Sequence, residues 1–334
     1  MGIQTTVVGS YPIPRWLYGD SSKGTLRDAI AVVLHTQEQA GLDLVADGEL
    51  NRFDPSHPET NGMIEYFVRP LSGVRTKCTV SDLDQFQALS GTITRSFPGS
   101  VVVGELGEGT LNLPADFEFV QGLTSKPLKF TCTGPHMLAK NVLDRFYGDM
   151  PALCMAIADV LRRQLQRIPA DVVQLDEASI TGHPEEWELA AAALNHVLDG
   201  VESPKAVHLC FGNYGGQSIQ SGIWGDLTPY LNALHCDFLL LEFARRGYDE
   251  LHQLSDIDPH KKFGLGVIDI KDNEVESPDL IASRIETATN ILGNEDRIAF
   301  VNPDCGFWML PRGVADHKMR SLVAGKNLFY GSDR

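Results

Sequence analysis

Short apolar runs alternate with helical patterns along most of the chain, and this alternation constrains the fold more than any other feature. Such runs predict buried strands, and the helices between them predict a parallel sheet, because a parallel crossover usually contains a helix. The eight predicted strands are Thr5–Gly9, Leu42–Asp47, Leu128–Cys132, Val172–Asp176, Ala206–Cys210, Phe238–Glu242, Phe263–Asp269 and Arg297–Asn302. We therefore predict an α/β fold, a closed (β/α)8 TIM barrel, with a doubly wound open sheet as the alternative.

Helix signals fill most of the intervals between these strands. An apolar stripe at helical spacing ends at Gly41, a residue type that stops helices. Pro151, Pro184 and Pro278 each open a further striped segment, as proline does at the first position of a helix.

One region, from about 67 to 123, breaks this rhythm. Alternating residues and turn residues in TKCTVSDLDQ, SGTITRSFPGSVVVGE and GEGTLNLP predict β-hairpins rather than a helix. We expect an insertion between the second and third strands, at the end of the barrel where long loops build substrate pockets. No linker divides the chain, so we predict one domain over residues 1–334.

The formal net charge of −16 over 334 residues disfavours nucleic acid and anionic membranes as partners. No apolar run reaches the length of a bilayer span, and the N-terminus has no secretory signal pattern. Six cysteines are scattered without the spacing of a disulfide framework. We therefore expect a cytoplasmic protein whose cysteines are buried thiols, metal ligands or nucleophiles.

Four residues with metal-ligating side chains follow predicted strands. His208 and Cys210 lie two apart, so a strand would point both to one face. Glu242 ends a strongly apolar run, where an unpaired carboxylate would be costly to bury. Cys305 precedes a glycine that lets the backbone turn close to a ligand. Two thiols, an imidazole and a carboxylate form a plausible zinc set at the end of the barrel that carries active sites. Taken singly, each could instead be a buried core side chain.

A second group of polar residues also lies at predicted strand ends. Glu49 follows the second strand, and Asp176 and Glu177 end the fourth. Two carboxylates facing one barrel mouth could hold an ammonium group, although helix capping is an alternative role for acids at such junctions. Asp269 fits a loop cap better than a ligand contact. Gly9 and Ser10 form a small pair at the end of the first strand, which allows close approach of a ligand to the backbone, with a tight turn as the alternative.

With these residues in place, the chain resembles the C-terminal catalytic barrel of cobalamin-independent methionine synthase. The matching segments are TTVVGSYP, DGELNRFD, NGMIEYF, TGP, VVQLDEAS, HLC, LLLEFA and VNPDCGF, from residue 5 to about 310. The resemblance implies a short, single-barrel form that binds zinc through four side chains and homocysteine through an acidic pair and a backbone segment. The implied zinc ligands are His208, Cys210, Glu242 and Cys305, and the implied homocysteine contacts are Glu49, Asp176 and the backbone around Ser10.

Two departures from the family pattern concern the methyl donor. Folate-using members carry a tryptophan shortly after the TGP segment, where this chain has Asn141. Those members also have a histidine in an Asp-Ile-His run, thought to protonate the leaving folate, where this chain reads Asp269-Ile270-Lys271. Both losses disfavour a methylfolate donor and make a corrinoid, or a corrinoid protein, a candidate in its place.

The sequence therefore predicts a zinc-dependent methyltransferase that moves a methyl group to a small-molecule thiol, homocysteine above all, in methionine biosynthesis. Glu242 is the hard ligand and is expected to yield its place to the incoming sulfur; with Asp269 and Lys271 it forms the candidate catalytic set. An alternative is a zinc-dependent transferase that joins a thiol to an epoxide, with Lys271, Arg245, Arg246 or Arg312 near an acidic thiol. A non-catalytic zinc scaffold fits less well, because structural sites rarely include a carboxylate.

Overall fold

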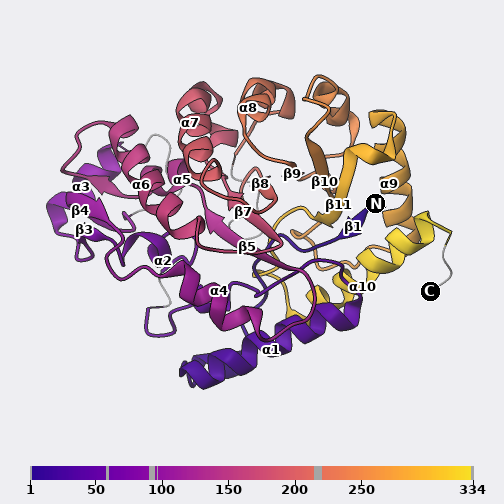
Figure 1. Ribbon diagram of the computed structural model, residues 1–334, viewed down its shortest axis with the longest axis horizontal. Helices are drawn as coiled ribbons and strands as arrows, with labels where there is room; N and C mark the ends of the chain where they lie inside the picture. Colours follow the sequence, from indigo (N-terminus) through magenta and orange to yellow (C-terminus); the bar gives the residue numbers. More distant parts are fainter. Residues whose placement is uncertain (1, 58–59, 90–94, 96, 214–219, 332–334) are drawn as a thin grey trace.

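Eight parallel strands form the central sheet, in the order β1-β11-β10-β9-β8-β7-β5-β2 (Figure 1). The computed structural model describes residues 2–57, 60–89, 95, 97–213 and 220–331. The strands of this sheet are β1 (Gln4–Thr5), β2 (Val45–Ala46), β5 (Leu128–Thr133), β7 (Val172–Asp176), β8 (Lys205–Leu209), β9 (Phe238–Leu241), β10 (Lys262–Ile268) and β11 (Ile298–Pro303). All eight overlap the strands predicted from the sequence.

A parallel bridge between Thr6 and Leu44 joins β1 to β2, the first and last strands of the sheet. The curled sheet is thereby closed on itself, as a (β/α)8 barrel requires. These two strands are shorter than predicted. Beyond Thr6 the backbone leaves the ladder, because the carbonyl of Val7 accepts a hydrogen bond from the Lys129 side chain and that of Val8 accepts one from Gln174 at 3.0 Å.

Helices surround this sheet, with α7 and α8 at the top of Figure 1 and α1 and α10 along the bottom. The helices outside the insertion are α1 (Lys23–Ala40), α5 (Pro135–Lys140), α6 (Met150–Leu165), α7 (Trp187–Leu198), α8 (Thr228–Ala233), α9 (Pro278–Leu292) and α10 (Arg312–Phe329). Only a 3-10 helix, Asp249–Leu254, lies between β9 and β10. None of the described helices combines the length and the apolar character needed to span a bilayer.

Helix boundaries follow the signals in the sequence. The side chain of Ser22 caps α1, Asp149 caps α6 and Ser277 caps α9, each by accepting a backbone N–H hydrogen bond in the first turn. Gly41 ends α1 in the left-handed conformation, with φ of 87°, as expected of a glycine after a helix.

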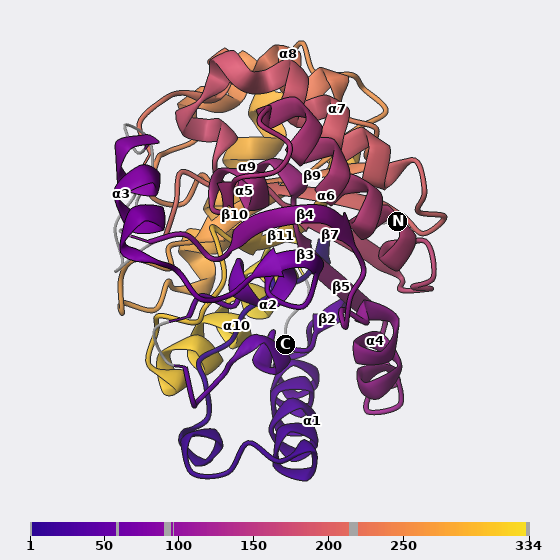
Figure 2. The ribbon, with the colours of Figure 1, turned by 90° about the vertical axis from the view of Figure 1, so that its left-hand side faces the viewer.

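The insertion contains more helix than the sequence patterns predicted. It holds α2 (Glu65–Val68), β3 (Ser72–Arg75), α3 (Val80–Leu89), β4 (Val101–Gly107) and α4 (Leu113–Gln121). β3 and β4 pair antiparallel, and β4 also pairs parallel with β6 (Leu143–Asp144), which follows α5. Figures 1 and 2 both place β3, β4 and α3 at one side of the barrel. The prediction of hairpins rather than a helix is therefore wrong for α3 and α4, and residues 90–94 and 96 of the proposed hairpin pattern lie outside the described residues.

Capping signals that mark both helices were missed. Thr79 and Asp82 form a reciprocal capping box: the Asp82 carboxylate accepts from the Thr79 N–H at 2.7 Å, and the Thr79 hydroxyl accepts from the Asp82 N–H at 3.2 Å. Asn112 caps α4 by accepting from the Ala115 N–H at 3.3 Å, and a proline follows in the first turn. These local hydrogen bonds outweigh the alternating pattern that suggested strands.

Candidate metal centre and adjoining acidic site

The predicted site residues lie at or after the carboxyl ends of barrel strands, with His208 as the second-last residue of β8. Cys210 comes directly after β8, Glu242 directly after β9, and Cys305 two residues after β11. Asp176 is the last residue of β7, and Glu49 follows β2. Because the strands are parallel, these residues meet at one end of the barrel.

Three of the four predicted metal ligands form a compact group. The ligand atoms of His208, Cys210 and Cys305 lie within 4.8 Å of one another. The sulfur atoms of Cys210 and Cys305 are 3.8 Å apart. Two sulfurs each about 2.3 Å from one zinc ion, at tetrahedral angles, lie roughly 3.8 Å apart, so this spacing fits a shared ion.

His208 has the orientation and tautomer that a metal ligand needs. Its Nδ1 atom lies 3.1 Å from the carbonyl oxygen of Leu240 and must donate to it, because a carbonyl can only accept. The Nε2 atom is buried and has no hydrogen-bond partner among the described residues. A ring nitrogen held in this way by the backbone is typical of histidines that bind a metal through the other nitrogen.

The two thiols need a cation between them to ionise together. The adjacent Cys305 thiol, together with burial, raises the pKa of the Cys210 thiol well above its ordinary value. A metal ion favours the thiolate form, which is also the form that binds it. The residues present therefore fit zinc in both spacing and chemistry.

Glu242, the fourth predicted ligand, is not part of this compact group. Its Oε2 atom lies 3.4 Å from the Nζ of Lys271, and both side chains are 1% exposed. Its Oε1 atom is buried and has no hydrogen-bond partner among the residues described. Burial disfavours the charged form of Lys271. The charges of Glu242, Cys210, Asp304 and Cys305 outweigh this effect and raise the pKa of Lys271 above its ordinary value. Lys271 is thus a cation within electrostatic reach of the proposed ligands.

Two residues that sequence reasoning missed fix the end of β9. The carboxylate of Asp304 accepts the backbone N–H groups of Phe243, Ala244 and Arg245 at 2.9 to 3.1 Å. The indole of Trp224 donates to the carbonyl of Glu242 at 3.2 Å. Burial raises the pKa of Asp304 to about 7. The Asp-Cys pair in VNPDCGF drew attention only to its cysteine, yet the aspartate orients the backbone that carries Glu242.

A glycine in β10 makes room for this contact. A Cβ atom on Gly266 would lie 2.1 Å from Asp304 Oδ1 and 3.0 Å from the Cα of Glu242. Any larger residue there would push the aspartate away from the end of β9.

Glu49 and Asp176 lie in a buried network of acids and bases beside the metal group. The Oε1 atom of Glu49 accepts from the Thr131 hydroxyl at 2.7 Å and lies 3.3 Å from an Arg52 nitrogen. Asp176 accepts from the Gln174 amide at 2.7 Å. Burial raises the pKa of Asp176 to about 6, while the nearby His208 opposes this rise and Glu49 adds to it.

Arg52 and Lys129 are the buried cations of this network, and sequence reasoning did not select them. Burial lowers the pKa of Lys129 to about 7, against the attraction of Asp176 and Glu49. Asp47, whose pKa burial raises to about 6, also interacts with Arg52. Among these five residues, three carboxylates and two cations leave one net negative charge when all are ionised, which suits one ammonium group. The sequence signal that could have identified Lys129 is the presence of a lysine within the apolar run of β5.

Comparisons with known proteins agree with this arrangement. A model of the family described as "Cobalamin-independent synthase, Catalytic domain" matches residues 3–326. The chain belongs to this family. Two relatives named methionine synthase, from Sulfurisphaera tokodaii and Thermococcus kodakarensis, are 29% and 27% identical to it. The first match covers 98% of this chain and 92% of the relative, and the second covers 97% and 92%.

Solved structures support the same fold. A B12-independent methionine synthase from a Shewanella species, in complex with selenomethionine, matches with a TM-score of 0.81 at 21% identity, over 99% of this chain and 98% of that one. A methyltransferase from Methanosarcina mazei matches with a TM-score of 0.62 at 13% identity, over 98% and 94%. The predicted family and the barrel fold are thus confirmed.

Within this synthase domain, the side chains of Asn141, Trp224 and Trp308 differ in their contacts and exposure. The amide of Asn141 donates to the Met137 carbonyl at 2.8 Å at the end of α5, so it is occupied by its own helix. Trp224 is fully buried, and its ring centroid lies 4.8 Å from that of Phe211, so it offers no free stacking surface. Trp308, three residues after Cys305, is 43% exposed.

Asp269 and Ser10 shape loops of the synthase domain at the same end of the barrel. Asp269 accepts the backbone N–H of Lys271 at 2.8 Å and pairs with Arg245 at 3.0 Å, which holds the turn that carries Lys271. The carbonyl of Ser10 accepts from the Phe307 N–H at 2.8 Å, which ties the loop after β1 to the loop that carries Cys305.

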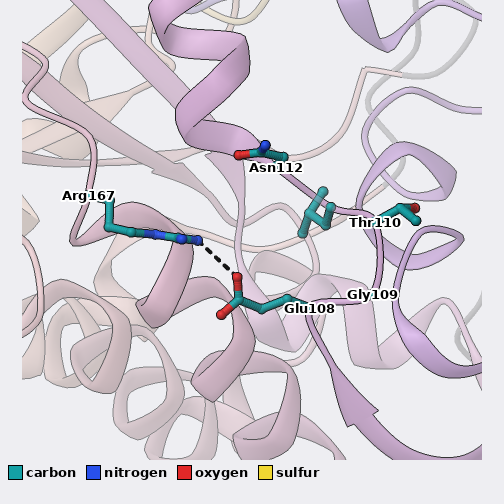
Figure 3. A pocket seen from close by; sticks show the side chains of 6 residues that line it. Glu108, Gly109, Thr110, Asn112 and Arg167 are labelled. Carbon is teal, nitrogen blue, oxygen red and sulfur yellow. Dashed lines mark hydrogen bonds and ion pairs between the residues drawn. The ribbon is translucent and has the colours of Figure 1, made fainter.

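A pocket elsewhere on the synthase domain contains none of the predicted site residues. It has a volume of about 300 Å3 and lies where the link from β4 to α4 meets the end of α6 (Figure 3). Glu108 on its wall pairs with Arg163 at 3.3 Å and with Arg167 at 2.9 Å. Its charged groups are already paired with one another, so it offers a ligand little.

Proposed function

We propose that the protein transfers a methyl group to the thiol of homocysteine, giving methionine, at a zinc site formed by four protein side chains. The ligands would be His208, Cys210, Glu242 and Cys305. The observation that carries this proposal is the compact group of two thiols and one imidazole beside a buried network of three carboxylates and two basic side chains. When bound, zinc would act as a Lewis acid that lowers the pKa of the acceptor thiol.

The acidic network would bind and orient the acceptor. Glu49 and Asp176 would hold the ammonium group of the amino acid, and the Arg52 guanidinium, 3.3 Å from Glu49, partly opposes the rise that burial causes in the pKa of Asp176. Asp176 closes β7 and pairs in register with His208 of β8, so this ammonium contact lies beside the metal group. The acceptor is thereby held at both ends, which fixes the direction of its sulfur.

The reaction itself is a displacement at the methyl carbon. The acceptor thiol loses its proton to solvent, and its sulfur attacks the methyl carbon of the donor. The new carbon–sulfur bond forms as the bond between methyl and donor breaks, and the electron pair of that bond leaves with the donor. Glu242 is the ligand proposed to yield to the incoming sulfur, because it is a hard oxygen ligand among softer ones.

The donor is proposed to be a corrinoid, or a corrinoid protein, rather than methyltetrahydrofolate. Asn141 offers no ring for a folate to stack on, and Lys271 is a weaker acid than the histidine of folate-using members. The contact with the Glu242 carboxylate stabilises the protonated form of Lys271, which makes Lys271 a still weaker proton donor. No observation favours the thiol–epoxide alternative. That reaction would need no carboxylates to bind an amine, and the family match does not favour it either.

A panel assay tests the proposal. Zinc-loaded protein is incubated with homocysteine, or with a thiol that lacks an amine, and with methylcobalamin, methyltetrahydrofolate or an epoxide. Formation of methionine from homocysteine is expected. Turnover of epoxide with the amine-free thiol, and none with homocysteine, would overturn the proposal.

A further inference from the structure

The carboxylate of Glu242 has a protein partner outside the compact group of proposed ligands. Its Oε2 atom lies 3.4 Å from Lys271 Nζ, and it stands outside the 4.8 Å group of His208, Cys210 and Cys305. The other three ligands gather without it. Its second oxygen, Oε1, is buried and has no hydrogen-bond partner among the described residues.

Both ends of this pair are anchored through the backbone rather than through the side chains. The Glu242 backbone is fixed by Trp224, and the residues after it are fixed by Asp304. The Lys271 backbone is fixed by Asp269. The strand end that carries Glu242 and the turn that carries Lys271 are therefore held independently of the contact between the two side chains.

We propose that Lys271 is a positioning residue that holds the Glu242 carboxylate whenever it is off the metal, and so makes Glu242 the exchangeable ligand. A buried carboxylate released from a metal would otherwise be left unpaired, which is costly. The lysine removes that cost and also repels a divalent cation nearby. Zinc is bound less tightly as a result, and an acceptor sulfur replaces the carboxylate more easily. This inference rests on the proposed function.

The first experiment uses zinc alone. Metal-free wild-type protein and variants compete for zinc with a chromophoric chelator at one fixed pH. Lys271→Met is expected to raise zinc affinity about tenfold or more, and Lys271→Arg, which keeps the charge, is expected to stay near wild type. Lys326→Met controls for the loss of a paired lysine, because Lys326 pairs with Asp43 at 3.0 Å at the opposite end of the strands. Unchanged or weaker zinc binding by Lys271→Met would overturn the inference.

The second experiment measures ligand exchange. X-ray absorption spectra of the zinc-loaded proteins are recorded with and without homocysteine. In the wild type, one oxygen ligand is expected to give way to sulfur. In Lys271→Met the oxygen should persist at the same thiol concentration, with at least a tenfold higher Kd for the thiol. Equal exchange in both proteins would contradict the role of Lys271.

The two proposals fail in different ways. A wild type that binds no zinc refutes the metal site and this inference together. A wild type that binds zinc and methylates homocysteine, with a Lys271→Met variant indistinguishable from it, refutes this inference alone. If Lys271→Met does not fold, Lys271→Gln, which retains a hydrogen-bond donor without the charge, is expected to raise zinc affinity in the same direction, and its failure to do so counts equally against the inference.

Discussion

The Nδ1 atom of His208 donates to the backbone carbonyl of Leu240 on the neighbouring strand at 3.1 Å, and this contact leaves Nε2 as the free ligand atom. The imidazole is thus oriented by the sheet itself rather than by a mobile side chain. The buried Nε2 atom faces the group completed by Cys210 and Cys305.

The first prediction follows from this group. Purified protein should contain about one zinc per chain, the stoichiometry of a single site. Cys305→Ser should lose most of that zinc and all thiol methylation, because a hydroxyl replaces a thiolate ligand. Metal content is measured by elemental analysis, with Cys236→Ser as the matched control, since Cys236 is a buried thiol outside the group. Full zinc content in Cys305→Ser would show that the ligand assignment is wrong.

The second prediction concerns the acceptor amine. Glu49→Gln or Asp176→Asn should raise the KM for homocysteine roughly tenfold or more, because a charge-assisted hydrogen bond contributes about 1.5–3 kcal/mol. Zinc content should not change. Steady-state kinetics measure this, with the exposed Glu118→Gln as control. An unchanged KM in both variants would remove these acids from the acceptor site.

The third prediction uses the close packing behind Glu49. A Cβ atom on Gly9 would lie 2.2 Å from Glu49 Oε1 and 3.0 Å from its Cδ. Gly9→Ala should therefore displace the carboxylate and weaken homocysteine binding, with zinc affinity kept. Calorimetric titration of homocysteine into the zinc-loaded variant tests this, and a Kd equal to that of the wild type would contradict the proposed placement of Glu49.

The fourth prediction concerns the donor. At equal concentrations of the two donors, homocysteine should be methylated faster from methylcobalamin than from methyltetrahydrofolate. A corrinoid leaves as a stable reduced metal ion and needs no proton, whereas the departing folate nitrogen does. Product formation is followed by mass spectrometry. The reverse preference would defeat the donor argument, and loss of that folate activity in Trp308→Ala would then identify the exposed indole as the stacking surface.

The fifth prediction concerns stability and pH. Burial lowers the pKa of His136, but its contacts with Glu177 and Glu186 outweigh this and raise it to about 9. Because the unfolded value is near 6.5, this stabilisation is fully present below about pH 6.5 and is lost as the pH rises through about 9. Between pH 6 and pH 9 the wild type should lose on the order of 2 kcal/mol more unfolding free energy than His136→Gln.

Urea denaturation at the two pH values measures this difference. The same substitution at exposed His260 serves as the control for loss of an imidazole. If the unfolding free energies of the wild type and His136→Gln changed in parallel with pH, folding would not raise the pKa of His136.

The barrel could be predicted from sequence because its signals are local. Each buried strand is a short apolar run, and capping side chains such as Ser277 mark where helices begin. The same local rules, applied to Thr79 and Asn112, would also have found α3 and α4. The error in the insertion came from giving alternation more weight than caps.

The sequence alone determined the barrel strands and the residue types of the site, because strand-forming runs and ligand chemistry are properties of short segments. Only the tertiary structure decided how those residues are paired. Glu242 meets Lys271, and Arg52 meets Thr131, across separations of 29 and 79 residues. The charge of a buried group depends on such distant partners, because burial removes water and leaves the nearest opposite charge to stabilise it. No local pattern records that partner, so the pairing that governs Glu242 emerged only when the strand ends were brought together.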